Sequence, residues 1–127
     1  MKAKLLICGE QIIQDQKLFN LLREKVDVSF LPNANGLESA MQQRRIDLVL
    51  FELSKNWQED LRQVQSVRER FSGIPFIIVD GGDSHKAVIE SFRAGLEDYF
   101  KKPYNPVLLA ERVEALLKRK DRMNGAK

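Results

Sequence analysis

Short apolar segments alternate with segments of helical periodicity along the whole of this chain. The apolar segments are Leu5–Cys8, Val26–Leu31, Asp47–Leu53, Pro75–Asp80 and Asp98–Lys101. Short apolar runs with polar or turn-forming residues around them are typical of buried strands. Strands that alternate regularly with helices form a parallel sheet that is covered by helices on both faces. We therefore predict an α/β fold, a three-layer sandwich around a five-stranded parallel sheet.

The segments between the apolar runs predict the helices. A helical pattern runs from residue 11 to Lys25, a short helix ends by Arg45, and a third helix stops at Ser72-Gly73. In the fourth helix, Asp83 is the expected N-cap, and Val88 and Phe92 are expected to point inward. Asn105-Pro106 predicts the start of the last helix, because proline suits the first helical turn.

The length and composition restrict the class of protein. A chain of 127 residues forms one core, and we expect a domain at 1–119 followed by a basic tail or linker at 120–127. No apolar run approaches the ~20 residues that cross a bilayer, and the apolar start is too short for a signal peptide. The single cysteine excludes an intramolecular disulfide and a cysteine metal cluster. We expect a cytoplasmic protein.

Charged residues follow several of the predicted strands. Glu10 follows the first strand, Glu52 ends the third, Asp80 ends the fourth and Lys102 follows the fifth. Open parallel sheets bind ligands outside the carboxyl ends of their strands. Up to three carboxylates and at least one lysine are therefore expected to meet at one edge of the sheet.

Four stretches of the chain together resemble one known family. They are Lys4-Leu-Leu-Ile-Cys-Gly-Glu10, Asp47-Leu-Val-Leu-Phe-Glu52, Pro75-Phe-Ile-Ile-Val-Asp-Gly81 and Ala94-Gly-Leu-Glu-Asp-Tyr-Phe-Lys-Lys-Pro-Tyr104. In order and spacing they resemble the receiver domains of bacterial two-component response regulators, over residues 4 to about 118. This resemblance implies a (βα)5 flavodoxin/receiver-like fold. It also implies a site for phosphoryl transfer from a histidine kinase to an aspartate, with Mg²⁺ held by an acidic pair.

The chain departs from the residues that this resemblance implies. Gly9 stands in place of the first acid of the pair, and Glu10 keeps the second. Glu52 replaces the acceptor aspartate, and Asp80, followed by Gly81, replaces a hydroxyl residue. The lysine of the family matches Lys102, and its aromatic switch residue matches Tyr99. We therefore expect a degenerate phosphorylation pocket with no catalytic residue.

Three interpretations of this pocket stay open from the sequence. Glutamate is longer than aspartate, so Glu52 could reach Lys102 and act as a partial mimic of a phosphoryl group, with less charge. Alternatively, Lys102 neutralises an acidic cluster in which Asp80 repels Glu52. The third interpretation is a divalent cation held by Glu10, Glu52 and Asp80, among which Glu10 and Glu52 are weak metal candidates. We expect no bound cofactor, Mg²⁺ included.

The favoured interpretation is an atypical receiver, a pseudo-receiver that is not an enzyme and that signals by binding a protein partner or a second copy. The family uses the face of the fourth helix, fifth strand and fifth helix for this purpose. Here that face includes Arg93, Tyr99, Lys101 and Arg112. An output domain fused beyond Lys127 is compatible with this interpretation, whereas contact with a membrane or direct nucleic-acid binding by this domain is not expected. The alternatives are an active phosphoreceiver with a rebuilt Mg²⁺ site and a small-molecule or metal binder.

The sequence also predicts where the side chains of four individual residues lie. Cys8 is expected in the core, and His85 is expected on the surface, with no second histidine or cysteine nearby. Trp57 either packs over the pocket or is exposed to a partner. Tyr99 either switches between buried and exposed positions or is permanently packed.

Overall fold

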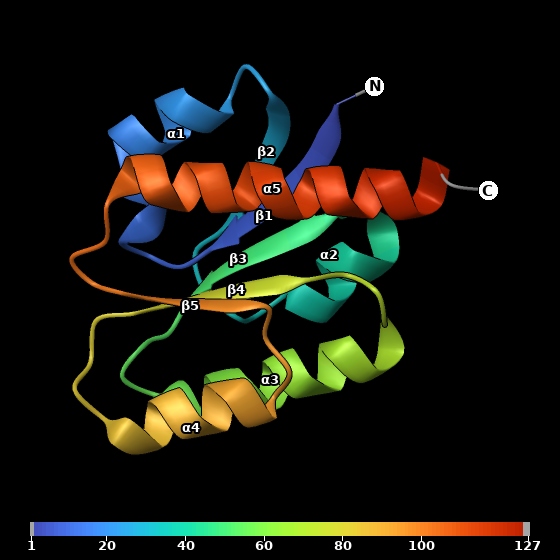
Figure 1. Ribbon diagram of the computed structural model, residues 1–127. Coiled ribbons are helices and arrows are strands. Elements are labelled where there is room, and N and C mark those ends of the chain that lie inside the picture. The colour runs from blue at the N-terminus through green and yellow to red at the C-terminus, as the bar shows by residue number, and fades with distance from the viewer. Residues whose placement is uncertain (1, 126–127) are drawn as a thin grey trace.

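A five-stranded parallel sheet forms the centre of the molecule (Figure 1). The structure is a computed structural model that describes the backbone of residues 2–125 and the side chains of residues 2–119. The strands are β1 (Ala3–Cys8), β2 (Val26–Leu31), β3 (Leu48–Glu52), β4 (Phe76–Asp80) and β5 (Asp98–Lys101). Their order across the sheet is β2-β1-β3-β4-β5. The predicted fold class is confirmed, and β2 lies at one edge of the sheet.

Helices cover both faces of the sheet. A short 3-10 helix η1 (Ile12–Gln14) precedes α1 (Gln16–Leu22), and α2 (Leu37–Gln43), α3 (Trp57–Arg70), α4 (His85–Arg93) and α5 (Pro106–Gly125) follow. Helices α1 and α5 lie on one face, and α2, α3 and α4 lie on the other (Figure 1). Because strand side chains alternate between faces, β3 and β4 are buried on both sides and are apolar along nearly their whole length.

Helix α4 differs from the expectation in two respects. Its N-cap is Ser84, whose hydroxyl accepts a hydrogen bond from the Ala87 amide at 3.2 Å, and Asp83 is not the cap. Its buried positions are Ala87 and Ser91, so Phe92 points outward and is 58% exposed. Residues at positions i and i+4 share a helix face, so the inward face of α4 carries two small residues and Phe92 lies outside it.

The last helix begins as predicted and continues past the expected domain boundary. Asn105 caps it, because its side-chain oxygen accepts from the Val107 amide at 2.9 Å. The backbone is helical to Gly125, whereas the side chains of the expected basic tail at 120–127 lie outside the described residues. Within the described part of the chain, no helix combines the length and the apolar character needed to span a membrane.

The strand register brings the expected site residues to one level. Cys8 is in register with Phe51, Glu52 with Val79, and Asp80 with Lys101. The loops after β1, β3, β4 and β5 therefore meet at the carboxyl edge of the sheet. The chain reverses its direction of progress across the sheet between β1 and β3, and this is where open α/β sheets form a crevice.

Candidate functional site

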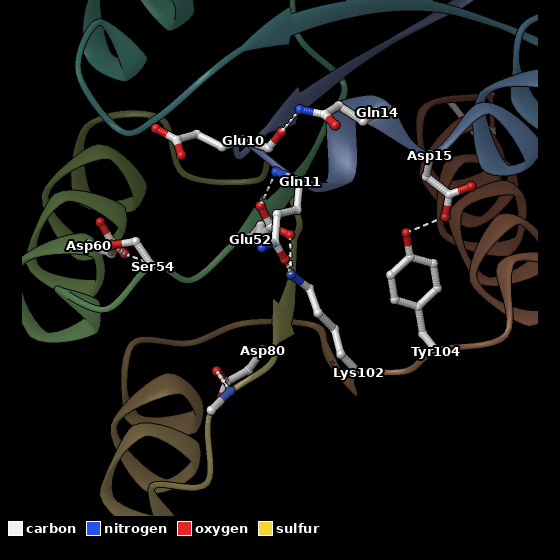
Figure 2. A network of polar contacts seen from close by, with 11 residues as sticks. Glu10, Gln11, Gln14, Asp15, Glu52, Ser54, Asp60, Asp80, Lys102 and Tyr104 are labelled. Carbon is white, nitrogen blue, oxygen red and sulfur yellow. Dashed lines mark hydrogen bonds and ion pairs between the residues drawn. The ribbon is translucent and has the colours of Figure 1, made fainter.

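An open cleft lies at the carboxyl edge of the sheet, between the loops that follow the strands. Its lining includes all six residues of the predicted degenerate pocket, which are Gly9, Glu10, Glu52, Asp80, Gly81 and Lys102. Polar and aromatic residues outside that prediction also line it, among them Gln11, Ser54, Asp60 and Tyr104. The side chains at the centre of the cleft form the polar network that Figure 2 shows.

Glu52 is the central residue of this network. It ends β3, it is only 8% exposed, and its Oε1 accepts a hydrogen bond from the Gln11 amide at 2.9 Å. Its Oε2 forms an ion pair with the Lys102 ammonium group. Lys102 also donates to Gln11 Oε1 at 2.8 Å, so this cation joins the loops after β1 and β5 across the buried carboxylate (Figure 2). A buried charge needs such a partner, and Glu52 has it.

Gly9 provides the space that Glu52 occupies. A Cβ atom at residue 9 would overlap the Cβ of Glu52 and lie 2.6 Å from its Oε1. Gly9 also has a φ of +147°, a conformation that is strained for residues with a side chain. The expected loss of the first acidic residue therefore coincides with a backbone conformation that excludes any side chain at this position.

Glu10 does not face the other carboxylates. It is exposed, and its carboxylate points away from Glu52 and Lys102 (Figure 2). Among the described residues, no three His, Cys, Asp or Glu side chains come together as a metal-binding group. Glu10, Glu52 and Asp80 therefore do not come together as a group of three carboxylates among the described residues.

Asp80 belongs to a different side of the sheet from Glu52. Asp80 is in phase with Ile78, which packs in the core beneath α2, α3 and α4, whereas Glu52 is in phase with Leu50 in the core beneath α1 and α5. Asp80 is 4% exposed, and its Oδ1 accepts from the Gly82 amide at 2.9 Å. Its Oδ2 accepts a hydrogen bond from the hydroxyl of Tyr99. The expected acidic cluster is thus divided between two separate networks.

Two further polar contacts hold the loops around the cleft. Asp15 caps α1 and accepts from the Tyr104 hydroxyl at 2.5 Å, which joins the loops after β1 and β5 a second time. Asp60 is buried in α3 and accepts from both the amide and the hydroxyl of Ser54, each at 2.7 Å. The sequence contained a signal for Asp15, which precedes a helix as a typical N-cap. It contained none for the partners of Tyr104 and Asp60, because these contacts depend on the tertiary fold.

The positions of the remaining candidates are clear. Cys8 is buried, and burial together with the carboxylates of Asp60 and Glu52 raises the pKa of its thiol to about 12, so it is a core residue as predicted. His85 is exposed as predicted. Trp57 is half-buried, packs against the core beneath α2, α3 and α4, and lines the cleft.

The residues predicted for a partner surface lie on α4, β5 and α5. Three of them are cations with anionic neighbours: Arg93 pairs with Glu90 at 3.0 Å, Lys101 with Asp83 at 3.5 Å, and Arg112 with Asp98 at 2.7 Å. The same elements expose large apolar side chains that the sequence analysis did not assign to a surface: Ile89, Phe92 and Leu108, which are 51%, 58% and 55% exposed. We call these three residues the apolar patch.

Curated relatives of similar sequence are bacterial regulators. No protein-family model matches the chain. The transcriptional regulatory protein RprY of Bacteroides fragilis is 27% identical to it over 123 residues, which cover 93% of this chain and 50% of RprY. The DNA-binding response regulator MtrA of Mycobacterium tuberculosis is 27% identical over 122 residues, which cover 95% of this chain and 53% of MtrA. The chain therefore spans about half the length of these relatives.

Solved structures of similar fold include response-regulator receiver domains. The CheY-like response regulator receiver domain protein of Methanospirillum hungatei superposes with a TM-score of 0.85 at 21% sequence identity. The superposition covers 97% of this chain and 99% of that one. A response regulator of Thermotoga maritima superposes with a TM-score of 0.80 at 23% identity, over 93% of this chain and 99% of that one.

The contact between Gly9 and Glu52 predicts that residue 9 tolerates no side chain. Gly73 is a matched control, because its φ is +93° and a Cβ there would meet nothing within 4 Å. We expect Gly73→Ala to lower the free energy of unfolding by about 1–2 kcal/mol, the cost of the backbone conformation alone. Gly9→Ala is expected to cost roughly 1–3 kcal/mol more, because the methyl group overlaps Glu52. Urea unfolding measures both, and equal losses would contradict the contact.

The ion pair predicts a specific role for Lys102 in stability. Lys102→Met leaves the buried Glu52 carboxylate without its cation, and we expect a loss of about 2–3 kcal/mol in the free energy of unfolding. Lys101→Met, the control, removes a more exposed lysine and is expected to cost about 0.5 kcal/mol or less.

The double variant Lys102→Met/Glu52→Gln separates loss of the pair from loss of packing. Its free energy of unfolding is expected to exceed that of Lys102→Met alone, since the uncompensated charge is gone. A double variant that is less stable than Lys102→Met would argue against a net stabilising pair.

Proposed function

Because this chain is a receiver domain of the response-regulator family, we propose that it acts as a pseudo-receiver: a signalling module that binds a protein and takes no phosphoryl group. The observation that carries this proposal is the buried ion pair between Glu52 and Lys102. Glu52 stands where the family has its acceptor aspartate. Its carboxylate is bound to Lys102 and to the Gln11 amide, so neither group is left to orient an incoming phosphoryl group.

The residues around Glu52 also fit Mg²⁺ poorly. Mg²⁺ requires a near-octahedral set of oxygen ligands, and in phosphoryl transfer it neutralises the charge that develops on the transferred group. Gly9 supplies no side-chain oxygen, and the Glu10 carboxylate points away from Glu52 (Figure 2). We propose that the domain binds no metal cofactor and is not an enzyme.

The geometry favours the partial mimic over the neutralised acidic cluster. Glu52 reaches the lysine that would otherwise bind phosphoryl oxygens, and Asp80 lies in another network on the opposite side of the sheet. A carboxylate carries one negative charge, compared with nearly two for a phosphoryl group at neutral pH. We propose that Glu52 holds the domain permanently in a state that other receivers reach by phosphorylation, with a weaker charge.

The apolar patch is the proposed contact surface, and a second copy of this chain is its proposed occupant. Ile89, Phe92 and Leu108 are each more than half exposed, and they lie on α4 and α5, two elements of the face that the resemblance implies for partner binding. The neighbouring cations Arg93, Lys101 and Arg112 each have an anionic partner within the chain. Such balanced charge around an apolar centre permits the surface to face its own copy without net repulsion.

The larger protein context follows from the relatives. RprY is described as a transcriptional regulatory protein and MtrA as a DNA-binding response regulator, and each is about twice as long as the matched region. We propose that this receiver acts with an output domain attached after α5, in the cytoplasm. Sequence-specific DNA binding would belong to that output domain.

The proposal predicts that the chain resists phosphorylation. After incubation with acetyl phosphate and Mg²⁺, we expect intact mass spectrometry to give the unmodified mass. A response regulator with a complete acidic pair and acceptor aspartate, treated in parallel, is the positive control. A stoichiometric gain of one phosphoryl group would overturn the pseudo-receiver, and peptide mapping would then identify the acceptor, with Asp80 as the first candidate.

The proposed surface predicts which substitutions weaken self-association. We expect sedimentation velocity to show a reversible dimer, and Phe92→Asp to weaken it by about tenfold or more, as the loss of a central apolar contact does. Leu21→Asp is the control, because Leu21 is also exposed but lies on α1, on the other face of the sheet. A strictly monomeric chain at all concentrations, or equal effects of both variants, would argue against this surface.

A further inference from the structure

The amino ends of three neighbouring strands carry a row of cations. When the register of β1 with β2 and β3 is extended to the start of the strands, Lys2 lies level with Lys25 on one side and with Arg45 on the other. Neighbouring strands are about 4.8 Å apart, so this row is about 10 Å long. Arg23 at the end of α1 and Arg44 at the end of α2 adjoin it. All five side chains are exposed, and we call them the basic edge.

Acidic side chains neutralise the basic edge only in part. Arg45 pairs with Asp47 at 3.3 Å, and Lys25 pairs with Glu114 at 2.9 Å. Glu24, which precedes Lys25 in the chain, is exposed. Five cations against these three carboxylates leave an excess of positive charge. Among the described residues, the cations of the basic edge that form no ion pair are Lys2, Arg23 and Arg44.

The position of Lys2 shows that this edge is more than a set of helix ends. Cations are favourable at helix C-termini, which accounts for Arg23 and Arg44 individually. Lys2 precedes β1 instead, and its ammonium group donates to the Arg23 carbonyl oxygen at 3.5 Å. Unpaired cations that are gathered in this way repel one another, and an external anion between them would relieve that repulsion.

The opposite end of the molecule carries the opposite charge. The cleft is lined by six carboxylates and only two lysines, whereas the chain as a whole has a net charge of +3. The domain is therefore electrically polar, with a negative cleft end and a positive amino end of the sheet. In the field of a polyanion, such a molecule turns its basic edge toward the negative charge.

We propose that the basic edge binds the phosphate backbone of a nucleic-acid duplex. Helix α5 ends on the side of the molecule where β1 begins (Figure 1), so an output domain attached after α5 would hold DNA close to the basic edge. This step rests on the proposed function and goes beyond it, because the receiver itself adds contacts to the backbone, without reading the sequence. One strand of a duplex carries a phosphate every ~3.4 Å along the helix axis, so the row of cations faces about three phosphates.

This inference differs from the expectation that the domain does not bind nucleic acid directly. That expectation considered only the basic residues near the end of the chain. The cations of the basic edge are dispersed between Lys2 and Arg45, and no run of basic residues in the sequence connects them. Only the strand register and the helix ends bring them together.

The test measures the binding of this chain to a fluorescently labelled DNA duplex of mixed sequence, by anisotropy at several salt concentrations. The variant is the triple substitution Lys2→Gln/Arg23→Gln/Arg44→Gln. It removes three positive charges from exposed side chains and breaks no ion pair among the described residues.

A second triple substitution is the matched control. Lys17→Gln/Lys55→Gln/Lys86→Gln removes the same number of charges, also from exposed side chains that form no ion pair among the described residues. These lysines lie at the cleft end, in the first turns of α1 and α4 and in the loop after β3. The two triple variants therefore have equal net charge and differ only in where the charge was removed.

We expect the wild type to bind the duplex about 40-fold more weakly at about 200 mM salt than at about 50 mM, as three phosphate contacts require. The basic-edge triple is expected to bind at least about tenfold more weakly at the lower salt concentration and to lose most of the salt dependence, since each phosphate contact contributes about one to the slope. The control triple is expected to keep the wild-type slope.

Three results would overturn the proposal. The first is a wild-type chain without salt-dependent binding, and the second is an equal loss in both triple variants, which would indicate attraction by net charge alone. The third is binding to vesicles that contain anionic lipid without binding to the duplex. Phosphorylation by acetyl phosphate or absence of a dimer would instead count against the proposed function, because neither measurement involves the basic edge.

Discussion

The structure of the cleft depends on one buried carboxylate and the lysine that compensates it. Glu52 ends the most buried part of the sheet, where an uncompensated charge would cost several kcal/mol. Lys102 meets that requirement, and the same ammonium group binds Gln11. The loops after β1, β3 and β5 are therefore held by a single cation. Gly9 is part of the same arrangement, because a side chain at residue 9 would occupy the volume that Glu52 fills.

The alternation of side chains along the strands separates two polar networks in this cleft. Glu52 and Lys102 belong to the side covered by α1 and α5, whereas Asp80 and Tyr99 belong to the side covered by α3 and α4. The two carboxylates lie on neighbouring strands and yet have different partners. One network joins the loops after β1, β3 and β5, and the other joins β4 to β5.

The architecture could be predicted from the sequence because it depends on local patterns. The apolar periodicity of β1 to β5 and the turn residues between them placed every strand within two residues of its position in the structure. The composition of the cleft could also be predicted, since parallel strands bring their carboxyl ends to one edge. Orientation could not be predicted. Backbone angles and strand phase decide that Glu10 points away from Glu52 and that Asp80 faces Tyr99. Phe92 is exposed because α4 buries small residues instead.

The two contacts between the loops after β1 and β5 have a consequence for the order of events during synthesis. Lys102 and Gln11 are 91 residues apart in the sequence, and Tyr104 and Asp15 are 89 apart. A nascent chain that has emerged only as far as β4 has made Glu52 but not its cation. The centre of the sheet can then be buried only around an unpaired carboxylate, which is unfavourable. The domain is therefore expected to complete its fold late, when β5 leaves the ribosome and the last strand brings the missing charge.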